Sequence, residues 1–237
     1  MSSVNERLLE LWRSAAEAGK PLPSEALLAT ALGVSRPKVR EELIRLESDG
    51  LVTRVPNSGT FPNRAALDIG LRLDQSYEFS RMLEAAGFDS TVEVIDSGWC
   101  EIDVERSIKL NVRAGSSAFQ TTKRWLANGE PIMIATDIIP ASRRDHGDPD
   151  PTRTVFELVE QLRGSSVEWE NTWVEAKLAD ARAAELLTLS PHESVLELTT
   201  LGISVLGTQL YLAEETHRQG VVPYGMIRSI PGRRASN

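Results

Sequence analysis

The chain has 237 residues, of which 41% are hydrophobic and 25% are charged, and its formal net charge is −8. This composition is typical of a folded protein with one or two domains, and the single cysteine excludes a disulfide framework and a cysteine-rich zinc site. The charge is unevenly divided, because residues 1–64 contain nine Lys/Arg and eight Asp/Glu whereas residues 65–237 contain seventeen and twenty-six. This asymmetry indicates two domains with different partners.

Three helices are predicted near the start of the chain. Apolar residues recur at helical spacing over residues 4–18. Ser24 is a good N-cap for a second helix over residues 25–32, and Ser35 for a third over residues 36–48, because a serine hydroxyl accepts a hydrogen bond from a backbone N–H at a helix start. The short break between the second and third helices is typical of a helix-turn-helix unit.

A small hairpin is predicted next. Residues 51–55 form a short strand pattern, residues 56–59 have turn composition, and Thr60 and Phe61 would form the return strand. Three helices and a hairpin within about sixty residues make a winged helix-turn-helix. Residues 62–75 have the character of a connector.

The rest of the chain alternates strands with short helices. Asn128-Gly129, between two strand patterns, is a strong hairpin signal. The predicted strands cover residues 91–99, 118–127, 131–139, 167–175, 195–204 and 209–216. The predicted helices cover residues 79–86, 104–110, 154–162 and 179–187. We therefore expect an α+β fold: a winged helix-turn-helix domain over residues 1–64, a linker over 65–75, and an α+β domain on a mainly antiparallel sheet over 76–237.

The first domain resembles the GntR family of bacterial transcription regulators in four stretches with the right order and spacing. These stretches are Leu22-Pro23-Ser24-Glu25 and residues 34–43, 46–52 and 58–61. The second domain looks like the ligand-sensing UTRA domain of the HutC subfamily, whose fold is similar to chorismate lyase. Its landmarks are Phe79-Ser80 and residues 128–131, 139–140, 184–187 and 194–196. The resemblance implies a homodimeric repressor that binds double-stranded operator DNA and is released by a small-molecule effector.

The expected DNA contacts come from the helix-turn-helix and the hairpin. Arg36 and Lys38 lie in the first turn of the third helix, which reaches base edges in the major groove, and an arginine there can bridge O6 and N7 of a guanine. Arg40 either contacts a phosphate or pairs with a nearby acid: Glu41, Glu42 or Glu47. The full expected set is Ser24, Glu25, Ser35, Arg36, Lys38, Arg40, Ser58, Gly59 and Thr60.

The tip of the hairpin departs from the family pattern. The family commonly has Gly-Arg-Gly-Thr there, with the arginine inserted into the minor groove, whereas this sequence has Asn57-Ser58-Gly59-Thr60. Because Ser58 carries no charge, we expect weaker and less A·T-selective contact with the minor groove.

The resemblance places an effector site between the sheet and Phe79-Ser80. Lys123 and Trp125 stand where the family has two alternating arginines, and Asp137 follows the position of a family glutamate by two residues. Without two arginines to fork a phosphate, a phosphosugar is disfavoured, and a small anionic or zwitterionic metabolite is expected. The expected effector residues are Phe79, Ser80, Lys123, Trp125, Asp137, Tyr211 and Arg218.

Several alternatives stay open. Arg218 could instead pair with Glu214 or Glu215, and the tryptophans could be core residues, with Trp169 and Trp173 forming a half-buried stripe on one strand face. The whole protein could be an enzyme of the chorismate-lyase-like fold acting on a small acid, or a DNA-binding architectural protein without an effector.

No catalytic or cofactor motif is present in the sequence. The three histidines have no metal-ligand spacing, and there is no Ser-His-Asp, P-loop or Rossmann fingerprint. No stretch approaches the roughly 20 apolar residues of a membrane-spanning helix, and charged residues among the first leucines argue against a signal peptide. We expect no cofactor, no metal, no membrane partner, no enzymatic activity and a cytoplasmic location.

Overall fold

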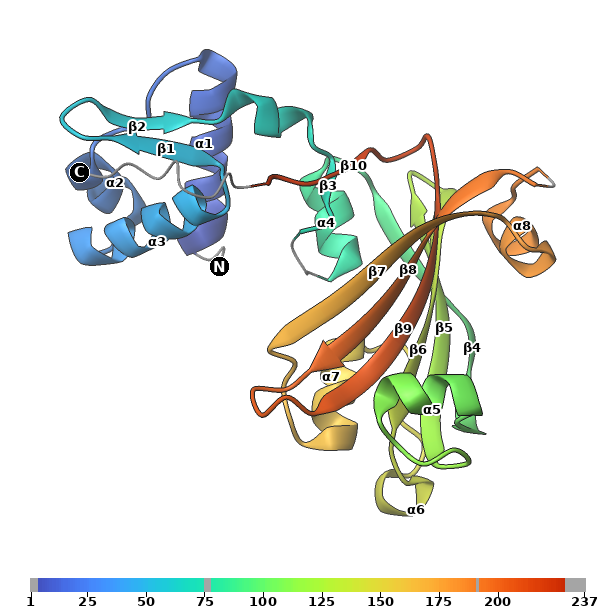
Figure 1. Ribbon diagram of the computed structural model, residues 1–237. Coiled ribbons are helices and arrows are strands. Elements are labelled where there is room, and N and C mark those ends of the chain that lie inside the picture. The colour runs from blue at the N-terminus through green and yellow to red at the C-terminus, as the bar shows by residue number, and fades with distance from the viewer. Residues whose placement is uncertain (1–3, 75–77, 191, 229–237) are drawn as a thin grey trace. The chain divides into compact units, whose positions relative to one another are not determined.

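The computed structural model describes residues 4–74, 78–190 and 192–228, which form two compact units (Figure 1). The first unit contains residues 4–74 together with residues 224–228, and the second contains residues 78–223. The expectation that the chain beyond residue 223 belongs to the second domain is corrected here. The strand β10 (Tyr224–Gly225) pairs in parallel with β3 (Leu71–Arg72), so the chain returns to the first unit.

The first unit is a three-helix winged helix-turn-helix. Its helices have the expected bounds: α1 (Val4–Ala18), α2 (Glu25–Leu32) and α3 (Arg36–Ser48). Strands β1 (Val52–Val55) and β2 (Gly59–Pro62) pair antiparallel as the wing, and a 3-10 helix, η1 (Arg64–Asp68), follows. The α1, α2 and α3 stripes meet in one apolar core, whose fully buried members include Leu8, Leu28, Val39, Leu43 and Leu46.

Two side chains of α1 connect it to the rest of this unit. The indole Nε1 of Trp12 donates a hydrogen bond of 2.7 Å to the backbone oxygen of Leu51, just before β1. The guanidinium of Arg7 donates to the backbone oxygens of Ala31 and Leu32 at 2.6 and 3.0 Å. Because carbonyls at a helix end lack intrahelical partners, Arg7 satisfies the end of α2 and fixes α1 against it.

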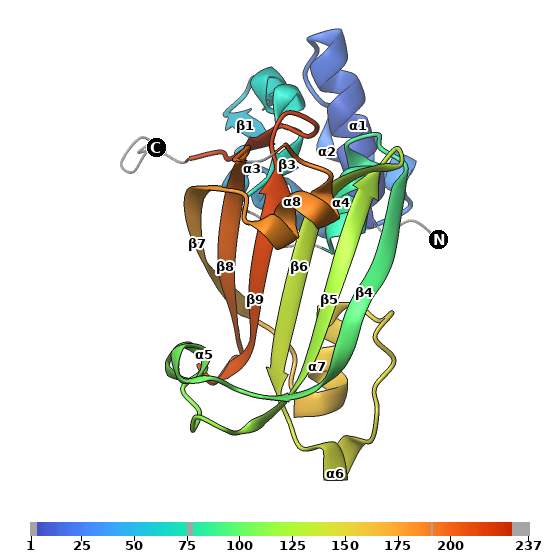
Figure 2. The same ribbon diagram turned by 90° about the vertical axis from the view of Figure 1, so that its right-hand side faces the viewer.

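The second unit is built on a six-stranded antiparallel sheet in the order β4-β5-β6-β9-β8-β7 (Figures 1 and 2). The strands are β4 (Ser90–Glu101), β5 (Ser117–Ala127), β6 (Glu130–Pro140), β7 (Trp169–Leu178), β8 (Ser194–Ile203) and β9 (Gln209–Arg218). The helices are α4 (Phe79–Ala85), α5 (Val104–Leu110), α6 (Arg143–His146), α7 (Val155–Arg163) and α8 (Ala181–Leu187). No helix among the described residues is long and apolar enough to cross a membrane.

Helices cover both faces of this sheet (Figure 2). On one face, named the α7 face here, Leu158 and Leu162 of α7 pack against Phe119 and Ile139. On the other, the α5 face, Leu110 of α5 packs in a second cluster with Ile138, Leu201 and Leu212, and α8 also contacts β6 there. Since successive residues of a strand point to opposite faces, the parity of a residue decides which face it serves.

Candidate DNA-reading surface and effector site

The caps of α2 and α3 form as the sequence predicts. The Ser24 hydroxyl accepts a hydrogen bond from the backbone N–H of Leu27, and the Ser35 hydroxyl one from Lys38, both at 3.4 Å. Gly33 ends α2 in the left-handed region (φ 69°), which glycine adopts without strain, and so permits the tight turn into α3. In the first turn of α3 the Lys38 N–H is bound to Ser35 and Pro37 has no N–H, so the Arg36 N–H and the positive end of the helix dipole are what this exposed N-terminus offers an anion.

The two cations in the first turn of α3 have different surroundings. Lys38 lies 3.1 Å from Glu41 and 3.0 Å from Glu42, and its hydrogen bond to Glu42 is the main reason that its pKa is raised. Arg36 is exposed and has no hydrogen bond or ion pair with any described residue. Of these two side chains, Arg36 is the one that is available to a base edge without breaking an existing contact.

Arg40 is paired across the two helices. Its Nε and Nη2 donate to the two carboxylate oxygens of Glu25 at 3.2 and 2.9 Å, and this bond lowers the pKa of Glu25. The expected alternatives Glu41, Glu42 and Glu47 are not its partner. Glu25 and Arg40 thus hold α2 and α3 in register, in addition to the predicted DNA role of each.

The wing presents its tip to solvent. Ser58 and Gly59 are exposed, and Gly59 has a φ of 118°, a conformation that L side chains rarely adopt. Thr60 connects the wing to the body, because its backbone oxygen accepts a hydrogen bond of 2.8 Å from Leu22. The wing does carry one cation near its tip, Arg54, which lies opposite Thr60 and was not expected from the sequence. The backbone N–H of Arg54 donates a hydrogen bond of 3.1 Å to Glu47.

The α7 face carries a buried polar group in the middle of the sheet. Thr121 lies opposite Asp137 and Lys123 opposite Ala135 on the paired strands β5 and β6, so these side chains share the α7 face. Lys123 is 3% exposed and Asp137 4%. Two buried ionisable side chains on one face are costly to maintain, and groups with perturbed pKa values are characteristic of functional sites.

Burial dominates the titration of both groups. It raises the pKa of Asp137 to about 7, against the opposing attraction of Lys123, while Glu215 and Glu170 add repulsion. Burial also lowers the pKa of Lys123, although Asp137 partly offsets it. The Lys123 ammonium donates a hydrogen bond to the backbone oxygen of Arg153, in the loop before α7.

Aromatic rings adjoin this polar group. The Phe79 ring, at the start of α4, meets Trp125 edge-on at a centroid distance of 6.0 Å and His217 at 5.6 Å. The three buried polar atoms without a hydrogen-bond partner among the described residues that share this region are Ser80 Oγ, Thr121 Oγ1 and Trp125 Nε1. An unsatisfied buried donor costs about 1–3 kcal/mol, so these atoms point to a missing partner.

Tyr211 lies further along the same face. It is 2% exposed, and its hydroxyl donates a hydrogen bond to Glu170 of β7. Burial raises the pKa of Tyr211 well above its usual range, and the Glu170 charge adds to this. Sequence reasoning missed Thr121, Glu170 and His217; the alternation of residues 121, 123 and 125 could have indicated the first.

Arg218 is not brought to this group. His217 packs on the α7 face, so the next residue along β9 points to the α5 face. Arg218 pairs instead with Glu130 at the sheet end, at 2.7 Å. Neither of the expected alternatives, Glu214 and Glu215, is its partner, and the strand register does not bring Arg218 beside Lys123 as the family resemblance implied.

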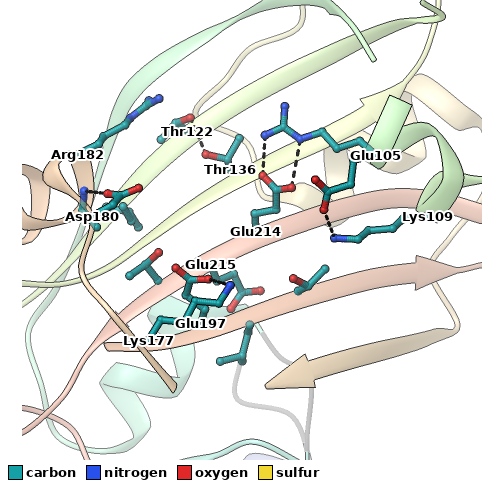
Figure 3. Close-up of a pocket in the computed structure, with 16 residues that line it drawn as sticks. Glu105, Lys109, Thr122, Thr136, Lys177, Asp180, Arg182, Glu197, Glu214 and Glu215 are labelled. Atoms are coloured by element: carbon teal, nitrogen blue, oxygen red, sulfur yellow. Dashed lines mark hydrogen bonds and ion pairs between the residues drawn. The ribbon is translucent and has the colours of Figure 1, made fainter. Parts of the chain in front are cut away.

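A cavity of about 330 Å³ opens on the α5 face, between α5, α8 and the strands (Figure 3). Its floor includes Thr122 and Thr136, whose hydroxyls lie 2.9 Å apart. Three acid–base pairs line it: Glu214 with Arg106 at 2.7 Å, Glu105 with Lys109 at 3.2 Å and Glu197 with Lys177 at 2.6 Å. Within the described chain, no three acidic, histidine or cysteine side chains gather as metal ligands would.

Solved structures share this architecture. YydK from Bacillus subtilis, described as a possible transcriptional regulator, aligns with a TM-score of 0.74 at 16% identity, over 96% of this chain and 100% of that one. PhnF from Mycobacterium smegmatis aligns with a TM-score of 0.59 at 18% identity, over 96% of this chain and 99% of that one. At these identities the likeness shows the fold.

Sequence comparisons give the family. The HTH-type transcriptional repressor NagR of Bacillus subtilis is 24% identical over 84% of this chain and 81% of its own length, and the histidine utilization repressor of Pseudomonas aeruginosa is 29% identical over 74% and 69%. Residues 2–61 match the model of bacterial regulatory proteins of the gntR family, and residues 85–220 match the UTRA domain. The chain therefore belongs to the GntR family of bacterial transcription regulators, as a member with a UTRA domain.

Proposed function

We propose that the chain is a cytoplasmic, homodimeric repressor that is released from its operator by a small polar effector bound at the Lys123 group of the α7 face. The observation that carries the effector site is the coincidence of a buried ammonium, a buried carboxyl and two unpaired buried polar atoms, Thr121 Oγ1 and Trp125 Nε1, on one face of one sheet. A third unpaired atom, Ser80 Oγ, comes from α4, whose Phe79 ring packs on that face. Such groups are normally satisfied, and a bound ligand can supply the missing partners.

In the first unit, the N-terminus of α3 enters the major groove. Arg36 reads a base edge, because it is exposed and unpaired among the described residues, while Ser35 and Ser24 place helix N-termini against phosphates. Less binding energy comes from Lys38, Arg40 and Glu25, because each would have to give up an ion pair within the protein in order to contact DNA. The wing residues Ser58, Gly59 and Thr60 approach the backbone without a charge of their own.

In the second unit, the side chains select the effector. Lys123 provides a single buried cation, which suits one carboxylate better than a doubly charged phosphate. Asp137 accepts from an amino or ring N–H group, and Trp125 Nε1 donates to a ligand oxygen. Phe79 closes the site with its ring, and Ser80 contributes its unpaired hydroxyl. An amino-acid-like zwitterion combines these features.

The effector acts by population shift. In the homodimer, two copies of α3 about one helical turn apart would read an operator with two-fold symmetry. A ligand releases this operator only if it binds an arrangement of the two units other than the DNA-competent one with higher affinity. The Lys123 group binds the effector and carries out no chemical step on it, so the effector is released unchanged.

The test is a thermal-shift screen of the full chain followed by operator release. The panel contains amino acids and other small carboxylates in one arm and phosphosugars in the other, and release from promoter DNA is followed by fluorescence anisotropy. We expect a carboxylate-bearing compound to raise the melting temperature and release the DNA. A phosphosugar that does both would overturn the effector class. A compound that the protein binds and converts chemically would contradict the proposal that the second unit only senses its ligand.

A further inference from the structure

The net positive charge of the first unit comes from the sequence that follows β10. Residues 1–74 contain ten Lys/Arg and ten Asp/Glu, so their charges cancel. Residues 224–237 contain three arginines, at positions 228, 233 and 234, and no acidic residue. By contrast, residues 75–223 contain thirteen Lys/Arg and twenty-four Asp/Glu. We name residues 228–237 the basic segment, because it makes the DNA-binding unit positive in an otherwise acidic chain.

The rest of the DNA-binding unit has few cations to spare for phosphates. Of the five cations on α3 and β1, four pair with acids of the same unit. These pairs are Lys38 with Glu42 at 3.0 Å, Arg40 with Glu25 at 2.9 Å, Arg45 with Glu42 at 3.5 Å and Arg54 with Glu47 at 3.7 Å. The wing from Val55 to Pro62 contains no charged residue. Since cations that neutralise phosphates supply much of the affinity for DNA, a further basic element would add to the contribution of Arg36.

The start of the basic segment is attached at the base of the wing. Ile227 packs on the apolar core of the first unit, and a Cβ added at Gly50 would lie 2.4 Å from the Cγ2 of Ile227. Gly50 lies between α3 and β1, and the side chain of Asn63, just after β2, donates a hydrogen bond of 3.0 Å to its backbone oxygen. Both ends of the wing therefore meet at the residue that Ile227 contacts, and the next residue, Arg228, is exposed.

Strand β10 fixes this attachment within the first unit (Figure 1). Besides the β3–β10 pairing, the backbone N–H of Leu73 donates a hydrogen bond of 2.9 Å to the backbone oxygen of Gly225. A Cβ added at Gly225 would lie 2.9 Å from the Cγ2 of Ile69, so the two backbones approach as closely as a glycine permits. The basic segment thus begins at a defined point of the DNA-binding unit.

The basic segment is long enough to reach DNA that lies beside the wing. The four residues of β1 extend about 13 Å from the base of the wing. Arg233 and Arg234 follow Ile227 by six and seven residues, and a chain spans up to about 3.3 Å per residue, so either arginine can lie up to about 20 Å from the anchor. Ile230 is the only large apolar residue between Ser229 and Asn237, so charge is the main chemical feature of this stretch.

We infer that the basic segment is a second DNA-binding element, in which Arg233 and Arg234 contact the duplex beside the wing. The inference rests on operator binding by the first unit and adds a contact outside the winged helix. Arginine is suited to this partner, because its guanidinium forms two parallel hydrogen bonds with a phosphate and is attracted to a narrow minor groove. The competing partner is the acidic second unit. Duplex DNA is favoured because it carries one negative charge per roughly 1.7 Å of its axis.

The test measures DNA affinity of the full chain by fluorescence anisotropy over a series of salt concentrations. The two probes are a duplex of its own promoter region and a random-sequence duplex of equal length. The variant Arg233→Gln/Arg234→Gln removes two charges, and Arg233→Lys/Arg234→Lys keeps them. Arg143→Gln/Arg144→Gln is the matched control, because it removes two neighbouring exposed charges from α6 of the second unit.

We expect the glutamine variant to bind both duplexes with a shallower dependence of log K on log salt, by about 1.8, and about 10-fold or more weaker at 0.1 M salt. The lysine variant and the α6 control should have the wild-type slope. A wild-type slope for the glutamine variant overturns the inference, and this is the result expected if the arginines pair with the second unit. An equal change in the α6 control also overturns it, since the effect would then come from net charge alone.

Other results separate this inference from the proposed function. A wild-type chain that binds neither duplex overturns both. A wild-type chain that binds and is released by its effector, alongside a glutamine variant with unchanged affinity and slope, overturns only the basic segment. Hydroxyl-radical footprinting of the promoter duplex is a second readout. The wild type should protect backbone positions that the glutamine variant leaves open, and identical footprints would contradict the contact.

Discussion

Arg40 and Glu25 join the two helices of the helix-turn-helix through a two-point ion pair, with N···O distances of 3.2 and 2.9 Å. Lys38 is likewise paired with Glu41 and Glu42. Acidic side chains therefore neutralise Lys38 and Arg40, whereas Arg36 is exposed and has no ion pair with a described residue. A cation that already has a partner gains less from a phosphate than a free one. The ion pairs therefore rank the basic residues of α3 for DNA contact.

The first prediction follows from this ranking. Arg36→Ala should weaken operator binding by about 1–3 kcal/mol, or about 5- to 150-fold, and relax the preference at one base pair, because a bidentate contact to guanine is lost. Arg40→Ala should cost less affinity. Fluorescence anisotropy on operator and mutated operator, over a series of salt concentrations, measures both. Arg45→Ala is the control from the end of the same helix, and equal affinities for Arg36→Ala and wild type would remove Arg36 as a reader.

The second prediction concerns the wing. Ser58→Arg should tighten operator binding and steepen the dependence of log K on log salt by about 0.9, since one further phosphate is neutralised. Ser58 is exposed at the tip, so the substitution meets no packing constraint. Ser58→Gln has similar bulk without the charge and should leave the slope unchanged. If the arginine variant has the wild-type slope, the wing does not reach the DNA.

Local signals were sufficient to predict the first unit. The bounds of α1, α2 and α3 agree with the sequence because the caps Ser24 and Ser35 and the terminating Gly33 act within a few residues of the helix ends. The partner of Arg40 was not predicted, because Glu25 lies fifteen positions away and only the packing of α2 on α3 brings the two together. The parallel β3–β10 pair was missed for the same reason.

The effector site shows the limits of sequence more clearly. Alternation along one strand was enough to place Lys123 and Trp125 on one face, and Asp137 joins them through the neighbouring strand of a hairpin. The contribution of β9 depends on pairing residues some eighty positions apart, such as Ala135 with Glu215, and no local pattern fixes that register. A shift of one residue reverses the face. Arg218 was chosen from its resemblance to a family arginine, whereas the register places its neighbour His217 on the α7 face.

The tryptophans of β7 illustrate the remaining difficulty. Their shared parity was visible in the sequence, but a half-buried stripe was expected, and the structure leaves Trp169 and Trp173 at 67% and 55% exposure. Alternation indicates that two side chains share a face and does not indicate what covers that face.

The third prediction distinguishes the two faces of the sheet. Lys123→Met should leave the chain folded and bound to its operator but unresponsive to the effector, because the buried cation is lost without a change of volume large enough to open the core. Arg218→Ala should keep the response, since Arg218 pairs with Glu130 instead. Isothermal titration with the effector and anisotropy with the operator measure the two functions. An unresponsive Arg218→Ala with a wild-type melting temperature would restore Arg218 to the site.

The fourth prediction concerns Gly202, which lies opposite Tyr211 on the α7 face. A Cβ added at Gly202 would lie 2.0 Å from Cε1 of the Tyr211 ring, so Gly202→Ala must displace the ring and its hydrogen bond to Glu170. We expect a loss of about 1–3 kcal/mol in the free energy of unfolding. Gly98→Ala on β4 is the control, because a Cβ there meets no atom within 4 Å. Equal denaturation midpoints for the two variants would contradict the close packing.

The last prediction is a pH dependence that belongs to Asp137. Its pKa rises from 3.8 to about 7 on folding, so between these values the folded chain keeps a proton that the unfolded chain has released. The stability that Asp137 allows is therefore greatest below pH 4 and decreases as the pH rises to about 7, by roughly 4 kcal/mol as an upper bound. Asp137→Asn lacks this titration. The free energy of unfolding of wild type minus that of Asp137→Asn, from urea denaturation at several pH values, should fall through this window and be flat above it.

Lys123 supplies the control for that experiment. Its charge attracts the Asp137 carboxylate and lowers the pKa of Asp137, in opposition to burial. In a Lys123→Met background the pKa of Asp137 should therefore be higher, and the difference between the single variant and Lys123→Met/Asp137→Asn should keep falling beyond pH 7. If neither difference depends on pH, Asp137 is ionised at its usual pKa, and water must reach the carboxyl that the folded sheet otherwise encloses at 4% exposure.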